Sequence, residues 1–189
     1  MHLTSEEKHH LLALAREAIS ETAHNRRSTD VDLDTLPDVF REDGASFVTL
    51  TKSGHLRGCI GCLEAYRPLA LDVQQNAISA AFHDPRFPPV TADEVDRLCV
   101  EISVLTPPEP LVYDGSDDLI AKLRPNIDGV VIQRGWQRAT FLPQVWEKLH
   151  NPHEFLQHLC LKAGLDAHAW QNGDLTVFTY QVQSFTENR

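Results

Sequence analysis

The sequence lacks several features that mark common classes of protein. No apolar run approaches the ~20 residues that a membrane-spanning helix needs, and no internal repeat, low-complexity segment or phosphate-cradling glycine loop is present. Basic residues are also scarce: 17 Lys and Arg stand against 27 Asp and Glu, so the net charge is −10 with His neutral. Because nucleic acids and anionic membranes both attract basic surfaces, we expect neither as a partner.

The first 25 residues carry charges throughout and have no continuous apolar core, so they do not resemble a secretory signal peptide. We therefore expect a cytoplasmic protein. Its four cysteines are Cys59, Cys62, Cys99 and Cys160. In a cytosolic chain of this size, paired disulfides are uncommon, so we expect free thiols.

The order of the expected elements favours an α+β fold with an antiparallel sheet over a doubly wound one, because helices alternate irregularly with hairpins. Thr4 and Glu7 form a capping box that begins a helix over residues 5–23, and a second helix is expected over residues 69–82. The chain of 189 residues suits one domain over residues 1–189, with a possible smaller lobe within about 66–125.

The most informative stretch runs from Leu56 to Gly61, in the second strand of an expected hairpin. Two glycines so close together in a strand, Gly58 and Gly61, suggest a bulge or a close backbone approach. Arg57 lies two residues from Cys59, and in a regular strand both would share one face. A guanidinium near a thiol favours the reactive thiolate. The alternative is a packed structural cysteine beside a surface arginine.

Cys59 and Cys62 form a C-x-x-C motif, which occurs in redox sites and as half of zinc sites. The sequence has no second C-x-x-C, and no βαβ pattern precedes this one. His150, His153 and His158 resemble a metal cluster on paper, but helical geometry separates them and no familiar ligand spacing accompanies them. We therefore expect no metal and treat the motif as a coincidence, with redox and zinc roles left open.

Two further segments carry charges that could reach a cleft. The segment from Asp84 to Val90 holds three prolines in five residues and should be stiff and extended. Its Asp84 and Arg86 could pair with each other or face a cleft. A clean strand pattern over residues 98–106 places Glu101 on a semi-polar face. If that face lies beside the hairpin, Glu101 could pair with Arg57.

Several stretches together resemble the AMMECR1 domain family, in order from about residue 10 to the C-terminus. These stretches are 47–50, 56–61, 80–82, 84–89, 101–105, 129–130, 142–145, 155–165, Phe185 and Glu187. The resemblance implies an α+β protein of two unequal lobes with both termini in the larger. It also implies association with a Memo-like protein and a radical-SAM enzyme, but no established activity and no known cofactor.

The motif residues that could do chemistry give two main hypotheses and a third, purely structural one. In an enzyme, Cys59 would be the nucleophile, Arg57 would favour its thiolate, and Glu101 or Asp84 would handle protons. In a binding module, Gly58 and Gly61 would allow close backbone approach, and Arg57 and Arg86 would hold a carboxylate or phosphate. The resemblance adds Lys162 to the ligand-binding candidates. In the third, Arg57 and Glu101 would form a buried ion pair and Cys59 would be core.

Overall fold

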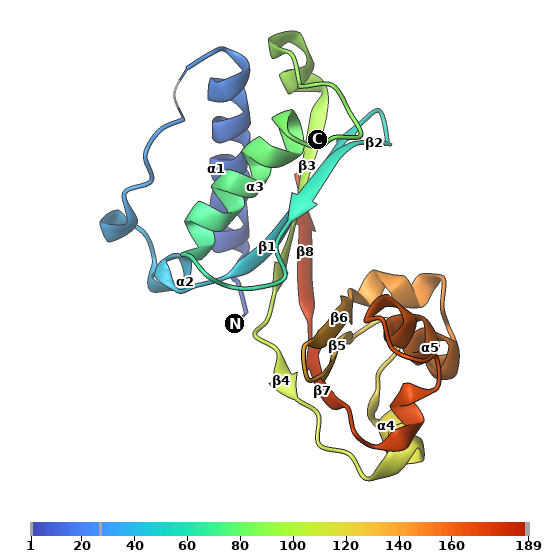
Figure 1. The fold of residues 1–189 in the computed structure, drawn as a ribbon. Coiled ribbons are helices and arrows are strands. Elements are labelled where there is room, and N and C mark those ends of the chain that lie inside the picture. Colours follow the sequence, from blue (N-terminus) through green and yellow to red (C-terminus); the bar gives the residue numbers. More distant parts are fainter. Residues whose placement is uncertain (1, 27, 188–189) are drawn as a thin grey trace. The chain divides into compact units, whose positions relative to one another are not determined.

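The computed structural model describes residues 2–26 and 28–187, and divides into two units (Figure 1). The larger unit comprises residues 1–105 and 183–189, and the smaller comprises residues 106–182. The larger unit therefore holds the described residues nearest both chain ends, as the resemblance implied. The smaller lobe was expected within about 66–125, but residues 69–82 form a helix of the larger unit, so that boundary is displaced along the chain.

The larger unit is a four-stranded sheet with two long helices packed on one face (Figure 1). Its strands lie in the order β2-β1-β3-β8, and β1 pairs antiparallel with both β2 and β3. The elements are α1 (Ser5–Ala23), α2 (Asp38–Arg41), β1 (Ala45–Lys52), β2 (His55–Gly61), α3 (Leu69–Phe82), β3 (Leu98–Leu105) and β8 (Val182–Thr186). The unit also contains two short 3-10 helices, η1 (Leu33–Thr35) and η2 (Ala92–Arg97).

The helices of this unit begin and pack where the sequence indicates. The capping box of Thr4 and Glu7 is formed at the start of α1. The apolar stripes of α1 and α3 cover alternate residues of β1 and β3, so that Val48, Leu50 and Ile102 are fully buried. Thr49 and Glu101 alternate with these residues, so they lie on the opposite face of the sheet, where both are only half-buried.

The smaller unit has its own antiparallel sheet, in the order β4-β7-β5-β6, and its own core. Its elements are β4 (Glu109–Pro110), α4 (Gly115–Lys122), β5 (Gly129–Arg134), β6 (Gln137–Phe141), η3 (Pro143–Glu147), α5 (Pro152–Lys162), η4 (Ala169–Asn172) and β7 (Thr176–Tyr180). Trp146 stacks on Phe155 with ring centroids 3.6 Å apart at the centre of that core. The α+β fold with antiparallel sheets is confirmed, as two sheets rather than one.

The chain passes from one sheet to the other at Gln181. β7 before it belongs to the sheet of the smaller unit, and β8 after it belongs to the sheet of the larger unit. Among the described residues, no helix has the length and apolar character needed to cross a membrane. The cytoplasmic location itself stays a prediction.

Candidate functional site

The Cys59 hairpin turns at Ser53 and Gly54, both with positive φ, which matches the twist of an antiparallel pair. Leu50 lies opposite Gly58, whereas Thr51 lies opposite Leu56, so Arg57 is the extra residue of a β-bulge. The glycine pattern predicted a bulge or a close approach at this point. The structure contains both.

Gly58 and Gly61 are approached by the protein's own atoms. A Cβ at Gly58 would lie 2.0 Å from the carbonyl oxygen of Ala80 in α3, and a Cβ at Gly61 would lie 2.3 Å from the ring of Phe47. Both positions therefore require glycine for internal packing. The expected ligand-binding role of these glycines is not needed to explain them, because that space is already filled.

Because Gly58 faces α3, its neighbour Cys59 faces the opposite side of the sheet. Thr49 lies directly across on β1 and donates a hydrogen bond from Oγ1 to Cys59 Sγ at 3.3 Å. Glu101 lies directly across from Thr49 on β3 and accepts a hydrogen bond from Thr186 at 3.3 Å. Cys59, Thr49 and Glu101 thus lie side by side on three neighbouring strands, and we call these three residues the side-chain row. Its two ends, Cys59 and Glu101, are two strand spacings apart, roughly 10 Å.

The free edge of β2 at Cys59 is held by two side chains. The Cys59 backbone N–H donates to Asp84 Oδ2 at 2.9 Å, and the Cys59 carbonyl accepts from Arg86 Nη2 at 3.2 Å. Arg86 also donates to both oxygens of Asp84, from Nε at 2.9 Å and from Nη2 at 2.6 Å. The pair therefore takes the place of a neighbouring strand at this one residue. We call Asp84 and Arg86 the edge clamp.

Asp84 is unsuited to the proton transfer for which the sequence made it a candidate. Its carboxylate is buried and accepts from Arg86 side-chain and backbone donors and from the Cys59 N–H. These hydrogen bonds, those from the Arg86 side chain above all, hold the pKa of Asp84 well below its usual range. A carboxylate with a pKa this low is not protonated near neutral pH, so it cannot act as a general acid, and its low basicity and occupied oxygens make it a poor general base. Asp84 instead positions Cys59.

The expected pairing of Arg57 with Glu101 is wrong. The bulge carries Arg57 towards η2, where Nη2 donates to Glu94 Oε2 at 3.0 Å. Lys52 donates to the other oxygen of Glu94 at 2.6 Å. Donors from Arg57 first, then from Lys52, lower the pKa of Glu94 to about 2. The cation beside Cys59 is Arg86, whose pKa is raised mainly by its hydrogen bonds to Asp84.

Lys162 belongs to the smaller unit, so the structure does not group it with the other candidates. It lies at the end of α5, where Nζ donates to the carbonyl oxygen of Thr140 at 2.9 Å and lies 5.1 Å from the centroid of the Phe141 ring. These contacts fix the end of α5 against β6. A ligand-binding role for Lys162 stays a prediction.

The C-x-x-C motif lies along extended chain. Cys59 is within β2 and Cys62 follows it, with its backbone N–H bonded to Ser46. The two Cα atoms are three residue steps apart along extended chain, or roughly 10 Å, which is beyond the ~7 Å limit for a disulfide. All four cysteines are free, and within residues 2–26 and 28–187 no group of three His, Cys, Asp or Glu could hold a metal ion.

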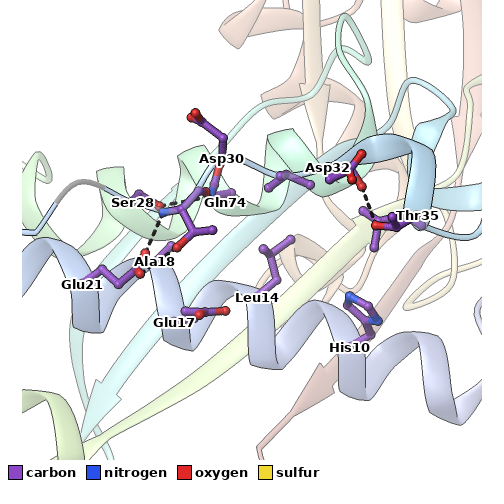
Figure 2. A pocket seen from close by; sticks show the side chains of 13 residues that line it. His10, Leu14, Glu17, Ala18, Glu21, Ser28, Asp30, Asp32, Thr35 and Gln74 are labelled. Atoms are coloured by element: carbon purple, nitrogen blue, oxygen red, sulfur yellow. Dashed lines mark hydrogen bonds between the residues drawn. The ribbon is translucent and has the colours of Figure 1, made fainter.

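A separate cavity of about 150 Å³ lies between α1 and the segment 28–36 (Figure 2). Leu14 and Ala18 line it on α1, with His10, Glu17 and Glu21 beside them. Glu21 accepts hydrogen bonds from the backbone and side chain of Thr29, which holds the segment against the helix. None of the predicted site residues lines this cavity.

Sequence reasoning missed two residues of the Cys59 region, Thr49 and Glu94. The signal for Thr49 was its alternation with buried Val48 and Leu50, which places it on the same face as Cys59. Glu94 forms a capping box with Thr91 at the start of η2, which gives no sign of a contact with β2. Its pairing with Arg57 depends on the bulge, which sequence alone does not locate to one residue.

Comparisons with known proteins agree over nearly the whole chain. The AMMECR1 family model matches residues 12–185. The chain is 45% identical to a protein of Methanothermobacter thermautotrophicus over 188 residues, which cover 98% of this chain and 97% of that protein. It is 38% identical to Protein MJ0810 of Methanocaldococcus jannaschii, with coverage of 98% and 92%.

The fold also matches a solved structure. The crystal structure of uncharacterized protein PH0010 from Pyrococcus horikoshii superposes with a TM-score of 0.81 at 35% identity, covering 98% of this chain and 94% of that one. The agreement in sequence and in fold confirms the resemblance drawn from the motifs. The chain therefore belongs to the AMMECR1 family.

Proposed function

We propose that the Cys59 thiol is the reactive group of a catalytic or covalent-carrier site on the sheet of the larger unit. The observation that carries this proposal is the edge clamp, which binds both main-chain polar groups of Cys59. Such a clamp fixes the thiol-bearing residue on an edge strand that would otherwise be free to fray. Cys59 is half-buried, whereas Cys160 is fully buried.

The groups near Cys59 suit nucleophilic attack by its sulfur on a substrate that lies over this face of the sheet. Thr49 donates a hydrogen bond to the sulfur, which holds the thiol on this face of the sheet. Glu101, further along the row, is placed to exchange protons with a substrate lying across β1. The Memo-like and radical-SAM partners implied by the family resemblance belong to this proposal as the proteins that supply or receive the substrate.

Thiol labelling tests the proposal directly. The folded protein is treated with substoichiometric iodoacetamide near neutral pH, and peptide mass spectrometry gives the labelling rate of each cysteine. We expect Cys59 to react faster than Cys99, and Cys160 to react slowest because it is fully buried. The same treatment in urea provides the control, since unfolding should equalise the rates. Labelling of Cys59 no faster than that of Cys99 in the folded protein would contradict a reactive thiol.

A non-catalytic binding module is the second candidate, and one observation favours it. The side chain that contacts Cys59 Sγ is a hydroxyl donor, Thr49, rather than a base that could take the thiol proton. Cys59→Ser separates the two functions. Loss of function with partner binding retained indicates an enzyme or carrier, whereas full function in the variant indicates a binding module. Co-purification from the native host supplies the partner for this assay.

A further inference from the structure

We infer that Arg86 is the anion-binding group of the Cys59 site and that the thiol reacts preferentially with electrophiles carrying a carboxylate, phosphate or similar anionic group. This inference rests on the proposed reactivity of Cys59 and adds the class of its substrate. It assigns Arg86 a role in specificity in addition to its structural role in the edge clamp.

The edge clamp is asymmetric in its exposure. The Asp84 side chain is 2% exposed, whereas the Arg86 side chain is 54% exposed. The buried carboxylate is occupied by the Cys59 N–H, the Arg86 backbone N–H and two guanidinium donors. The pair thus presents its positive end outward, and its negative end is enclosed. An approaching ligand therefore meets the exposed guanidinium before the enclosed carboxylate of the same ion pair.

The guanidinium also lies at the residue that carries the thiol. Nη2 of Arg86 is 3.2 Å from the Cys59 carbonyl oxygen, and the bidentate contact with Asp84 fixes the plane of the group. A fixed, planar donor group is well matched to the two oxygens of a carboxylate or phosphate. An anionic group held there would place an adjoining electrophilic atom near Sγ.

The other charged candidates do not serve this purpose as well. Arg57 is 11% exposed and its charge is directed to Glu94. Its Nη1 atom is buried without a hydrogen-bond partner among the described residues, so a ligand could not reach it without opening the structure. Glu101, the opposing charge on the same face, stands roughly 10 Å from Cys59, beyond the ~8 Å screening length at physiological salt. Of the two charged groups that contact Cys59, Asp84 is enclosed, so Arg86 is the one that a ligand at the thiol can reach.

Two methanethiosulfonate reagents of opposite charge test the inference. One carries a sulfonate (ethyl sulfonate) and the other a trimethylammonium group (ethyl trimethylammonium). In both reactions the thiolate attacks the sulfenyl sulfur, a disulfide bond forms, and methanesulfinate leaves with the electron pair of the broken S–S bond. Because the thiolate and leaving group are the same in both, the ratio of the two rates at Cys59 cancels the thiolate fraction and reports the local charge. Peptide mass spectrometry reads the rate at Cys59 alone.

We expect the ratio of sulfonate to trimethylammonium rates at Cys59 to fall roughly two- to fivefold in Arg86→Gln, the effect of an exposed ion pair. Arg86→Lys should keep most of the preference, because it keeps the charge. Arg97→Gln, which removes an exposed arginine paired with Asp93 in η2, is the matched control and should leave the ratio unchanged. Raising the salt concentration should reduce the wild-type ratio but not that of Arg86→Gln.

The outcomes separate this inference from the proposed function. If Cys59 reacts with neither reagent, the proposed reactive thiol fails and the inference fails with it. If Cys59 reacts readily but the ratio is the same in wild type and Arg86→Gln, only the inference is overturned. Should Arg86→Gln fold poorly, the double variant Asp84→Asn/Arg86→Gln removes both charges and leaves no buried carboxylate unpaired. Because it removes a negative charge as well as a positive one, the ratio should fall in the same direction but by less than in Arg86→Gln, and an unchanged ratio would overturn the inference.

Discussion

Two arginine–carboxylate pairs flank Cys59, and they differ in which end meets solvent. In the pair of Arg57 and Glu94, both side chains are largely enclosed, at 11% and 13% exposure. In the edge clamp, Asp84 is enclosed but the guanidinium of Arg86 is half-exposed. The first pair ties β2 to η2. The second fixes the backbone of Cys59 and leaves a cation available beside it.

The comparison shows that residue type and spacing do not settle the role of an arginine. Arg57 is nearer to Cys59 in sequence, yet the bulge directs it to Glu94. Arg86 is 27 residues away, yet it contacts the Cys59 carbonyl because α3 and the following turn return the chain to the edge of β2. We therefore expect substitutions in the first pair to affect stability and those at Arg86 to affect the reactivity of the thiol.

The largest expected effect is on stability, from Arg57→Met. The substitution removes the guanidinium from a buried carboxylate that keeps Lys52 as its other partner, so we expect a loss of about 2 kcal/mol in the free energy of unfolding. Urea denaturation followed by circular dichroism measures it. Arg97→Met, at an exposed arginine, is the control and should stay within about 0.5 kcal/mol.

The same Arg57→Met protein should keep the wild-type ratio of sulfonate to trimethylammonium rates at Cys59. This second measurement tests whether Arg57 and Arg86 have the same effect on the charge preference of the Cys59 thiol. A ratio that fell as far in Arg57→Met as in Arg86→Gln would show that both cations act on the thiol. The distinction between the two pairs would then be lost.

The next effect concerns the pH dependence of the Arg57–Glu94 pair. The pKa of Glu94 is lowered from 4.5 to about 2 in the folded protein, mainly by Arg57 and Lys52. A lowered folded-state pKa gives stability that is fully present above pH 4.5 and is lost as the pH falls towards 2. The stability difference between wild type and Glu94→Gln should therefore be roughly 1–2 kcal/mol smaller at pH 3 than at pH 7.

Urea denaturation of both proteins at pH 7, 4.5 and 3 measures this difference. Other carboxylates, including Asp84, titrate in both proteins, so their contributions cancel in the comparison. If the difference stayed constant between pH 4.5 and pH 3, Glu94 would not be the acceptor that the structure shows. Its pairing with Arg57 would then add little to the fold.

Much of the fold could be predicted from local patterns, because those patterns act over a few residues. The capping box of Thr4 and Glu7 fixed the start of α1, and the glycines at 58 and 61 indicated a close backbone approach. Asp84 was a candidate site residue because it lies close to Arg86 in the stiff, proline-rich segment 84–90. The α+β class followed from hairpins between helices, and the family resemblance added the two lobes.

The remaining features depend on contacts between residues far apart in sequence. The register of β1 with β3 brings Glu101 into the row of Cys59, but it also places Thr49 between them. The glycines at 58 and 61 suggested a bulge, but the local sequence does not show that it falls at Arg57 and turns this side chain towards Glu94. The assignment of residues 106–182 to a unit with its own core likewise depends on packing, and it separates Lys162 from the candidates of the larger unit.

The smallest expected effect comes from Thr49→Val. This substitution tests the contact between Thr49 and Cys59 and leaves the edge clamp unchanged. Valine keeps the shape of threonine and suits a strand, but it removes the hydroxyl that donates to Cys59 Sγ. We expect the rate of Cys59 alkylation by iodoacetamide at neutral pH to fall about two- to threefold, since one weak hydrogen bond to the sulfur is lost. The free energy of unfolding should change by less than about 0.5 kcal/mol.

Thr51→Val is the matched control, because Thr51 lies on the same strand and face but opposite Leu56 rather than Cys59. A decrease in both variants would indicate a general change in β1, and no decrease in Thr49→Val would remove Thr49 from the site. If only Thr49→Val slows the reaction while the ratio of the charged reagents stays at the wild-type value, two contributions are separated. Thr49 then sets how readily the thiol reacts, and Arg86 sets which electrophiles it prefers.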